Sequence, residues 1–187
     1  MGTVLHRIWG LTLIGYLLVA GISNASASDR LTALPPDERA AWSAIGVIAS
    51  QGREGVVQCS GVLVAPDLVI TAAHCTTKNT GLMDSLQFIA GLDGSRHIAS
   101  SSAVEIIRHP VWDYASGKNK LRVDLAALRL SRLIPAGKVQ AAKLREASRP
   151  LAQSGGFFGY QKSAEKSLHG RFGCALTQSL LPNVVTS

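Results

Sequence analysis

Short apolar stretches, each only a few residues long, recur from residue 43 onward and are separated by glycine, proline and polar turns. They are rich in Val, Ile and Leu, and their length and composition favour β-strands. We expect strands at residues 43–49, 58–64, 68–71, 86–90, 103–108 and 125–130. Pro66-Asp67 is typical of a turn, so residues 58–71 are predicted to form a hairpin. This spacing of strands indicates an all-β barrel or sandwich.

Two boundaries divide the rest of the pattern. Residues 28–41 hold Pro35-Pro36 between charged residues and are expected to form an extended leader. Residues 42–149 are expected to form a first β-barrel, and the lysines and arginines of residues 138–149 indicate a linker at its end. Residues 150–187 have room for only a few more strands, which we expect around residues 157–160 and 170–176.

The first 27 residues have the layout of a secretory signal peptide. Arg7 precedes an apolar run over residues 8–21, and Ala25-Ser26-Ala27 supplies the small residues that a signal peptidase accepts. An uncleaved membrane anchor is the alternative, but the run is shorter than the ~20 apolar residues that cross a bilayer. We therefore expect a secreted protein, extracellular or periplasmic, without stable membrane insertion.

The charge balance adds little to this picture. The chain has 19 basic and 12 acidic side chains. Arg7 is the one charged residue of the expected signal peptide, so its removal leaves 18 basic against 12 acidic side chains, a surplus of six. The cations are scattered, without a run and without interleaved aromatic residues. A solvated surface explains them better than nucleic-acid binding does.

Three cysteines, Cys59, Cys75 and Cys174, lie in a chain that is expected to be exported, where thiols tend to pair. One of them must remain, as a free thiol, in an intermolecular bridge or with a partner outside the given sequence. Apart from a spacing that suits a disulfide, no His and Cys pair has the spacing of zinc ligands, so we expect no metal and no cofactor.

Residues 59–75 are the segment most informative about chemistry. The apolar strand expected at residues 68–71 runs into two alanines, whose small side chains allow a tight turn, and His74 follows directly. An anchored histidine suits general base catalysis, which needs a fixed geometry and a pKa near neutrality. If Cys59 and Cys75 pair, they close a loop of about 16 residues beside the imidazole and stabilise the fold by roughly 3 kcal/mol.

This segment resembles the histidine motif of the trypsin and chymotrypsin family of serine proteases, Thr-Ala-Ala-His-Cys with a second cysteine one hairpin earlier. Residues 123–130, Val-Asp-Leu-Ala-Ala-Leu-Arg-Leu, are similar to the family segment that supplies a buried aspartate. The resemblance implies that His74 and Asp124 are catalytic and that Cys59 pairs with Cys75. The alternatives are that His74 is structural and that Asp124 caps a turn.

The resemblance also implies a chymotrypsin-like double β-barrel and a secreted endopeptidase that acts on a protein or peptide substrate. Trp42-Ser43-Ala44-Ile45-Gly46 is similar to the bacterial trypsin-like and glutamyl endopeptidase-like relatives, and the Ile-Val-Gly-Gly start of many family members is absent before it. This start matters because it is the site of activation by cleavage in those members.

The expected nucleophile is where the sequence departs from the family, because the segment Gly-Asp-Ser-Gly-Gly is absent. Ser154 is a superficial substitute that lies 154 − 124 = 30 residues beyond Asp124, too soon for a second barrel, and we expect it to belong to the linker. Cys174 occupies the place of a second-barrel cysteine whose family partner precedes the serine. We therefore expect a complete first barrel, an incomplete, C-terminally truncated second barrel, and a chain that is inactive as given. The alternative is a catalytically inactive homologue or fragment that acts as a binding protein.

Overall fold

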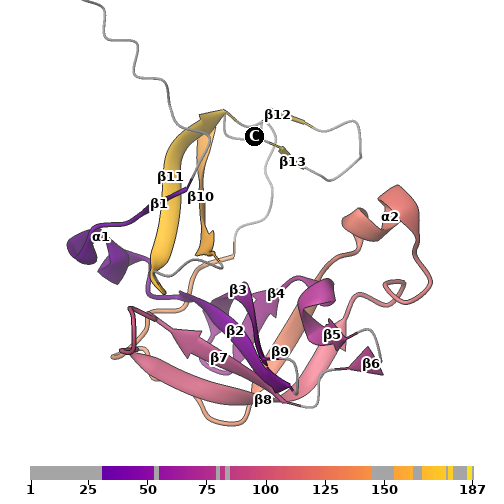
Figure 1. Ribbon diagram of the computed structural model, residues 1–187, viewed down its shortest axis with the longest axis horizontal. Coiled ribbons are helices and arrows are strands. Elements are labelled where there is room, and N and C mark those ends of the chain that lie inside the picture. The colour runs from indigo at the N-terminus through magenta and orange to yellow at the C-terminus, as the bar shows by residue number, and fades with distance from the viewer. Residues whose placement is uncertain are drawn as a thin grey trace, which may run out of the picture.

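Six antiparallel strands close into a barrel in the order β2-β3-β4-β9-β8-β7. The strands are β2 (Ile45–Gly52), β3 (Gly55–Ala65), β4 (Leu68–Thr71), β7 (Leu86–Ala90), β8 (Ala99–Arg108) and β9 (Ala126–Leu130). Figure 1 shows the barrel in the lower half of the molecule. The computed structural model describes residues 31–52, 55–78, 81–82, 85–144, 154–161, 166–175, 177–178 and 185–186. The predicted signal peptide, residues 1–27, lies outside the described residues.

The strands predicted from the apolar stretches are confirmed, and each barrel strand overlaps one of them. The predicted hairpin is also confirmed, since β3 and β4 pair through Val62 with Ile70 and Leu63 with Val69. A register shift lies between Leu63 and Ala65, where the chain approaches the turn. The all-β fold class therefore holds for this part of the chain.

Alternation along the strands decides which side chains fill the barrel. Successive strand residues point to opposite faces, so Leu86, Phe88 and Ala90 of β7 lie inside together. Leu128 and Leu130 of β9 reach the same core from another wall of the barrel. The loop after β9 closes one end, because Ile134 and Val139 are buried in this core as well.

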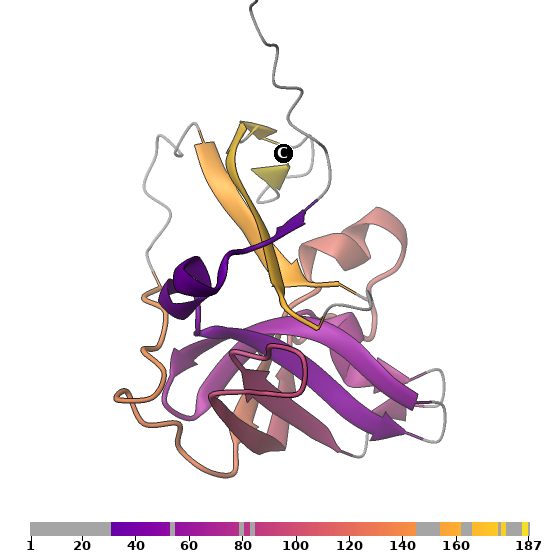
Figure 2. The ribbon, with the colours of Figure 1, turned by 60° about the vertical axis from the view of Figure 1, so that its left-hand side comes forward.

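A second sheet of three strands, in the order β1-β11-β10, lies against the barrel. It consists of β1 (Thr32–Ala33), β10 (Ser154–Tyr160) and β11 (Leu168–Ala175). Figures 1 and 2 both show it on one side of the barrel, across β2 and β3. Trp42 stacks on Phe158 with ring centroids 4.0 Å apart, and the backbone N–H of Tyr160 donates to Ser60 Oγ at 2.8 Å. The described chain thus combines one closed barrel with a partial second sheet, consistent with a chymotrypsin-like fold.

The segment before the barrel contains the strand β1 and a helix, α1 (Pro36–Ala41). The expectation of an extended leader is therefore wrong for the residues of α1. Proline at the first helical position sets a helical φ, and Asp37 and Glu38 in the first turn suit the positive end of the helix. Leu34 is buried and its N–H donates to the carbonyl of Leu168, while Arg39 pairs with Asp93. These contacts join the segment to the second sheet and to the barrel.

Shorter elements complete the described chain. They are η1 (Ala73–Thr76), β5 (Thr77–Lys78), β6 (Gly81–Leu82), α2 (Gly117–Arg122), β12 (Thr177–Gln178) and β13 (Val185–Thr186). Of the predicted linker at residues 138–149, the described part runs along the barrel, and the N–H of Ala142 donates to the carbonyl of Leu63. The helices of the described chain are all too short or too polar to cross a membrane.

Tyr160, at the junction between the second sheet and the barrel, makes the stability of the fold depend on pH in the alkaline range. Burial raises the pKa of its phenol from the usual 10 to about 12, and the hydroxyl donates to the carbonyl of Leu92 at 3.2 Å. Between these two values the folded chain keeps a proton that the unfolded chain loses. This contribution to stability is therefore complete below about pH 10 and is lost as the pH rises through about 12.

We expect Tyr160→Phe to flatten the fall of unfolding free energy with pH across this window. Urea titrations at several pH values between about 9 and 12 measure the slope for the wild type and the variant. Tyr114→Phe is the matched control, because Tyr114 is 87% exposed and its removal should leave the slope unchanged. Parallel slopes for Tyr160→Phe and the wild type would contradict the assignment.

Candidate active site

His74 is placed by the end of β4 and the first turn of η1. Ala72 continues the extended chain, and the carbonyl of Ala72 accepts a hydrogen bond from the N–H of Cys75 at 3.1 Å. Ala73 is fully buried against Trp112 and Ala126, so only a very small side chain fits at this position. The buried Ala73 therefore anchors the backbone directly before His74.

Asp124 lies two residues before β9. In the barrel β4 and β9 are antiparallel neighbours, and Thr71 at the end of β4 pairs with Ala126 at the start of β9. The residues that follow β4 and those that precede β9 consequently meet at the same edge of the barrel. This pairing is what brings together two residues that are 50 positions apart.

Both carboxylate oxygens of Asp124 contact His74, one through the imidazole ring and the other through the backbone N–H. His74 Nδ1 lies 2.6 Å from Asp124 Oδ2, and the backbone N–H of His74 donates to Asp124 Oδ1 at 2.9 Å. The imidazole is 62% exposed, whereas the carboxylate is only 19% exposed. A proton on Nδ1 that is held by the carboxylate leaves the lone pair on Nε2. The arrangement thus selects one tautomer and turns Nε2 into the basic atom.

The second of these contacts was not predicted from the sequence. A backbone amide has no residue signature, so no motif could have indicated that the His74 N–H holds Asp124 Oδ1. Its effect is to fix the carboxylate relative to the backbone that carries the imidazole. The pair is therefore more rigid than a single side-chain hydrogen bond would make it.

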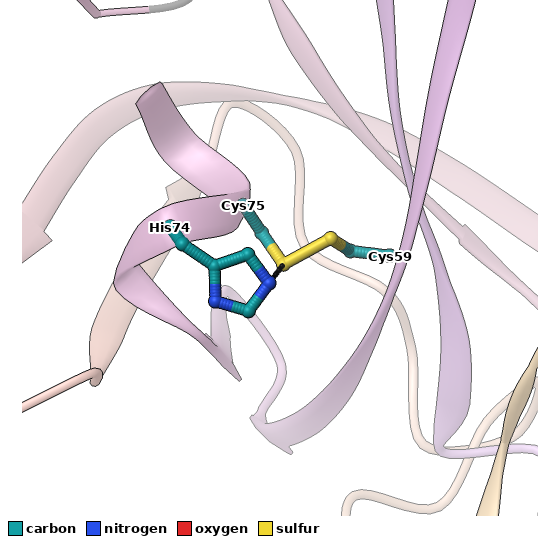
Figure 3. Close-up of side chains that lie close together, drawn as sticks. All are labelled: Cys59, His74 and Cys75. Atoms are coloured by element: carbon teal, nitrogen blue, oxygen red, sulfur yellow. Dashed lines mark hydrogen bonds between the residues drawn. A yellow bond between two sulfur atoms is a disulfide. The ribbon is translucent and has the colours of Figure 1, made fainter. Parts of the chain in front are cut away.

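The predicted disulfide between Cys59 and Cys75 is confirmed. It joins β3 to η1 with a Cα separation of 6.1 Å and lies against the imidazole, as Figure 3 shows. His74 Nε2 is 3.4 Å from Cys75 Sγ. Cys59, His74 and Cys75 are also a group of potential metal ligands, but the two sulfurs are bonded to each other in this structure.

Ser154 and Cys174 both lie in the second sheet. Ser154 is exposed and begins β10, where it pairs with Ala175, so the expectation that it belongs to a linker is wrong. Cys174 is a buried free thiol, in keeping with the expectation that one cysteine remains. Within the described part of the chain, Nε2 of His74 contacts Cys75 Sγ and not a serine hydroxyl.

Comparison with known proteins identifies the family of this chain. The family model "Trypsin" matches residues 36–177. Proproteinase E of Bos taurus is 34% identical over 96 residues, which cover 46% of this chain and 34% of that protein. Chymotrypsin-like elastase family member 3A of Homo sapiens is 33% identical over 92 residues, covering 46% and 32%. The matches thus span about a third of the length of these curated relatives.

Solved structures share the fold at low sequence identity. A Glu endopeptidase matches with a TM-score of 0.68 at 17% identity, covering 82% of this chain and 71% of that one. The protease Anisep of Arthrobacter nicotinovorans matches with a TM-score of 0.58 at 19% identity, covering 74% and 66%. With the family model spanning more than half of the residues, and with a closed barrel of the same architecture, this chain belongs to the trypsin family.

Proposed function

We propose that this protein is a secreted serine endopeptidase in which His74 is the general base and Asp124 orients it. The observation that carries the proposal is the 2.6 Å contact between His74 Nδ1 and Asp124 Oδ2 at one edge of the barrel. Membership of the trypsin family supports peptide-bond hydrolysis as the reaction and proteins as the substrates. The signal-like residues 1–27 and the disulfide support an exported protein.

Each group has a defined part in the proposed reaction. Nε2 of His74 takes the proton of a serine hydroxyl as the serine oxygen attacks the peptide carbonyl, and then gives it to the leaving amine. Asp124 keeps the other ring proton on Nδ1 and stabilises the imidazolium between these two steps. Backbone N–H groups near the nucleophile stabilise the negative oxygen of the tetrahedral intermediate.

The serine itself is the part that residues 1–187 do not supply in this proposal. The sequence contains no Gly-Asp-Ser-Gly-Gly segment, and Ser154, the substitute weighed above, begins β10 without the preceding Gly-Asp. We assign the nucleophile to sequence outside these 187 residues. The disulfide next to η1 would then serve to hold the base in place for a serine from the other half of the enzyme.

A comparison of two forms of the protein tests this proposal. One form is residues 1–187, and the other is the reading frame of the gene continued past the codon for Ser187. Hydrolysis of a fluorescently labelled protein substrate measures activity, and covalent labelling with a fluorophosphonate marks an activated serine. We expect both signals from the longer form alone, and we expect His74→Ala in that form to abolish them.

The control is His97→Ala, which removes another exposed histidine and should leave hydrolysis and labelling unchanged. A genuine stop after Ser187, together with no hydrolysis, would contradict an active protease and favour the inactive homologue that acts as a binding protein. Full activity of His74→Ala would contradict the role of His74.

A further inference from the structure

We propose that a pocket beside His74 and Asp124 binds an acidic side chain of the protein substrate, and that Arg122 holds its carboxylate. The pocket has a volume of about 310 Å³ and lies between α2 and the loop that follows β8. Its lining residues are His109, Val111, Ala115, Asn119, Arg122 and Val123. That the ligand belongs to a protein substrate rests on the proposed function.

The pocket is built on the backbone that flanks Asp124. Val123 directly precedes Asp124 and packs against the apolar cluster that anchors the chain before His74. The opposite wall is joined to the residue after Asp124, because the backbone N–H of His109 donates to the carbonyl of Leu125 at 2.9 Å. Figures 1 and 2 show α2 on the same side of the barrel as η1. We therefore place the pocket on the path of a protein segment that is bound at His74.

The polar side chains of the lining all donate hydrogen bonds, and none of them is acidic. Arg122 ends α2 and Asn119 lies three residues earlier, so the two share a face of the helix. Nδ1 of His109 accepts a hydrogen bond from the N–H of Val111 at 3.4 Å, so the neutral ring carries its proton on Nε2. Several donors around one positive charge are the groups that recognise a carboxylate.

The side chain of Arg122 has no hydrogen-bond or ion-pair partner among the described residues. The acids closest to it in the sequence are already bound, because Asp113 pairs with Arg108 and both oxygens of Asp124 contact His74. A guanidinium presents its donors as a planar fork that fits a carboxylate through two parallel hydrogen bonds. The partner that the described fold does not supply is therefore expected from the ligand.

The rest of the surroundings favours an acidic side chain over a bare anion. Val111, Ala115 and Val123 form apolar walls that suit the methylene groups of such a side chain. Known ligand pockets have volumes of about 300 to 1,000 Å³, so this one fits a small group. α2 also carries Lys118 and Lys120 and has no acidic residue, and a local excess of positive charge attracts an acidic segment.

Paired peptide substrates test the pocket in the longer form of the protein. Each pair differs only by glutamate against glutamine, at one position that is moved in turn along the peptide, with the residue directly before the cleaved bond held constant. We expect kcat/KM to be about fivefold higher for glutamate at one position, the size typical of an exposed charged pair, with the effect mainly in KM. Arg122→Gln should remove this preference.

Arg132→Gln is the matched control and should keep the preference for glutamate. Arg132 is also exposed and loses the same charge, but it follows β9 whereas Arg122 precedes it, and the five residues of the strand span roughly 17 Å. Hydrolysis of the glutamine peptides reports on the proposed function by itself. Hydrolysis without a preference for glutamate, or a preference that survives in Arg122→Gln, overturns the pocket and leaves the protease in place.

A titration followed by NMR tests the pocket in the 187-residue chain without any need for activity. The probe is N-acetyl-glutamate N-methylamide, and the glutamine analogue is its uncharged counterpart. We expect the signals of Asn119 and Arg122 to shift towards saturation with the glutamate probe, with about fivefold weaker binding of the glutamine analogue. Arg122→Gln should abolish the difference between the two probes. The absence of a saturable shift, or equal binding of both probes by the wild type, overturns the proposal.

Discussion

Replacement of Asp124 with asparagine is expected to lower kcat of the active protease about 10⁴-fold, the size of the loss for this change in a well-studied Ser-His-Asp protease of the same fold. The physical reason is the tautomer. An amide NH₂ that faces Nδ1 of His74 stabilises the ring with its proton on Nε2, and that nitrogen then has no lone pair for the proton of serine. The kcat is measured on a peptide amide substrate with the longer form of the protein, in which we expect the nucleophilic serine.

Asp113→Asn is the control for this prediction. Asp113 also contacts a basic side chain, since Arg108 Nη1 lies 2.8 Å from its carboxylate, but Asp113 itself is 59% exposed. Exposed ion pairs contribute about 0 to 1 kcal/mol, so we expect kcat and stability to change little. A loss below tenfold for Asp124→Asn, or an equal loss for Asp113→Asn, would refute the orienting role of Asp124.

Phe88→Ala is expected to lower the free energy of unfolding by about 3 to 5 kcal/mol, the range for removal of a buried phenylalanine side chain. Phe88 has no exposed surface and lies in the centre of the barrel core. Its ring packs directly on the backbone of Gly46, where a Cβ atom would come within 2.5 Å of it. The surrounding strands are closed into a barrel and cannot collapse fully into the cavity.

Urea unfolding measures this change through the transition midpoint. Val104→Ala is the matched variant in the neighbouring strand β8, because Val104 is 66% exposed, and we expect a change within about 0.5 kcal/mol. Similar midpoints for Phe88→Ala and the wild type would show that the ring does not stabilise the barrel core.

The strands were the part of the fold that local pattern could predict. The apolar stretches at β4 and β7 match the observed bounds, Leu68–Thr71 and Leu86–Ala90, because turn or polar residues lie directly before β4 and on both sides of β7. The helices α1 and α2 were not predicted. Each has six residues and none of them is buried, so neither has the apolar periodicity that identifies a helix.

The two-residue strand β1 was also beyond sequence reasoning. It is defined by its pairing with β11, in which Thr32 lies opposite Gly170. A partner 138 residues away leaves no trace in the local pattern. The segment that the sequence suggested was an extended leader is in part a member of the second sheet.

For the candidate site, the sequence by itself determined the chemistry of the parts: an anchored histidine, a carboxylate before an apolar strand and two cysteines at a family spacing. Tertiary structure alone decided their geometry. The pairing of Thr71 with Ala126 brings the ends of β4 and β9 together, and with them His74 and Asp124. The Cys59–Cys75 disulfide joins β3 to η1 and lies beside the imidazole, with Cys75 Sγ 3.4 Å from His74 Nε2. The physical reason is that hydrogen bonds between distant strands set these distances, whereas residue order specifies only the groups that meet.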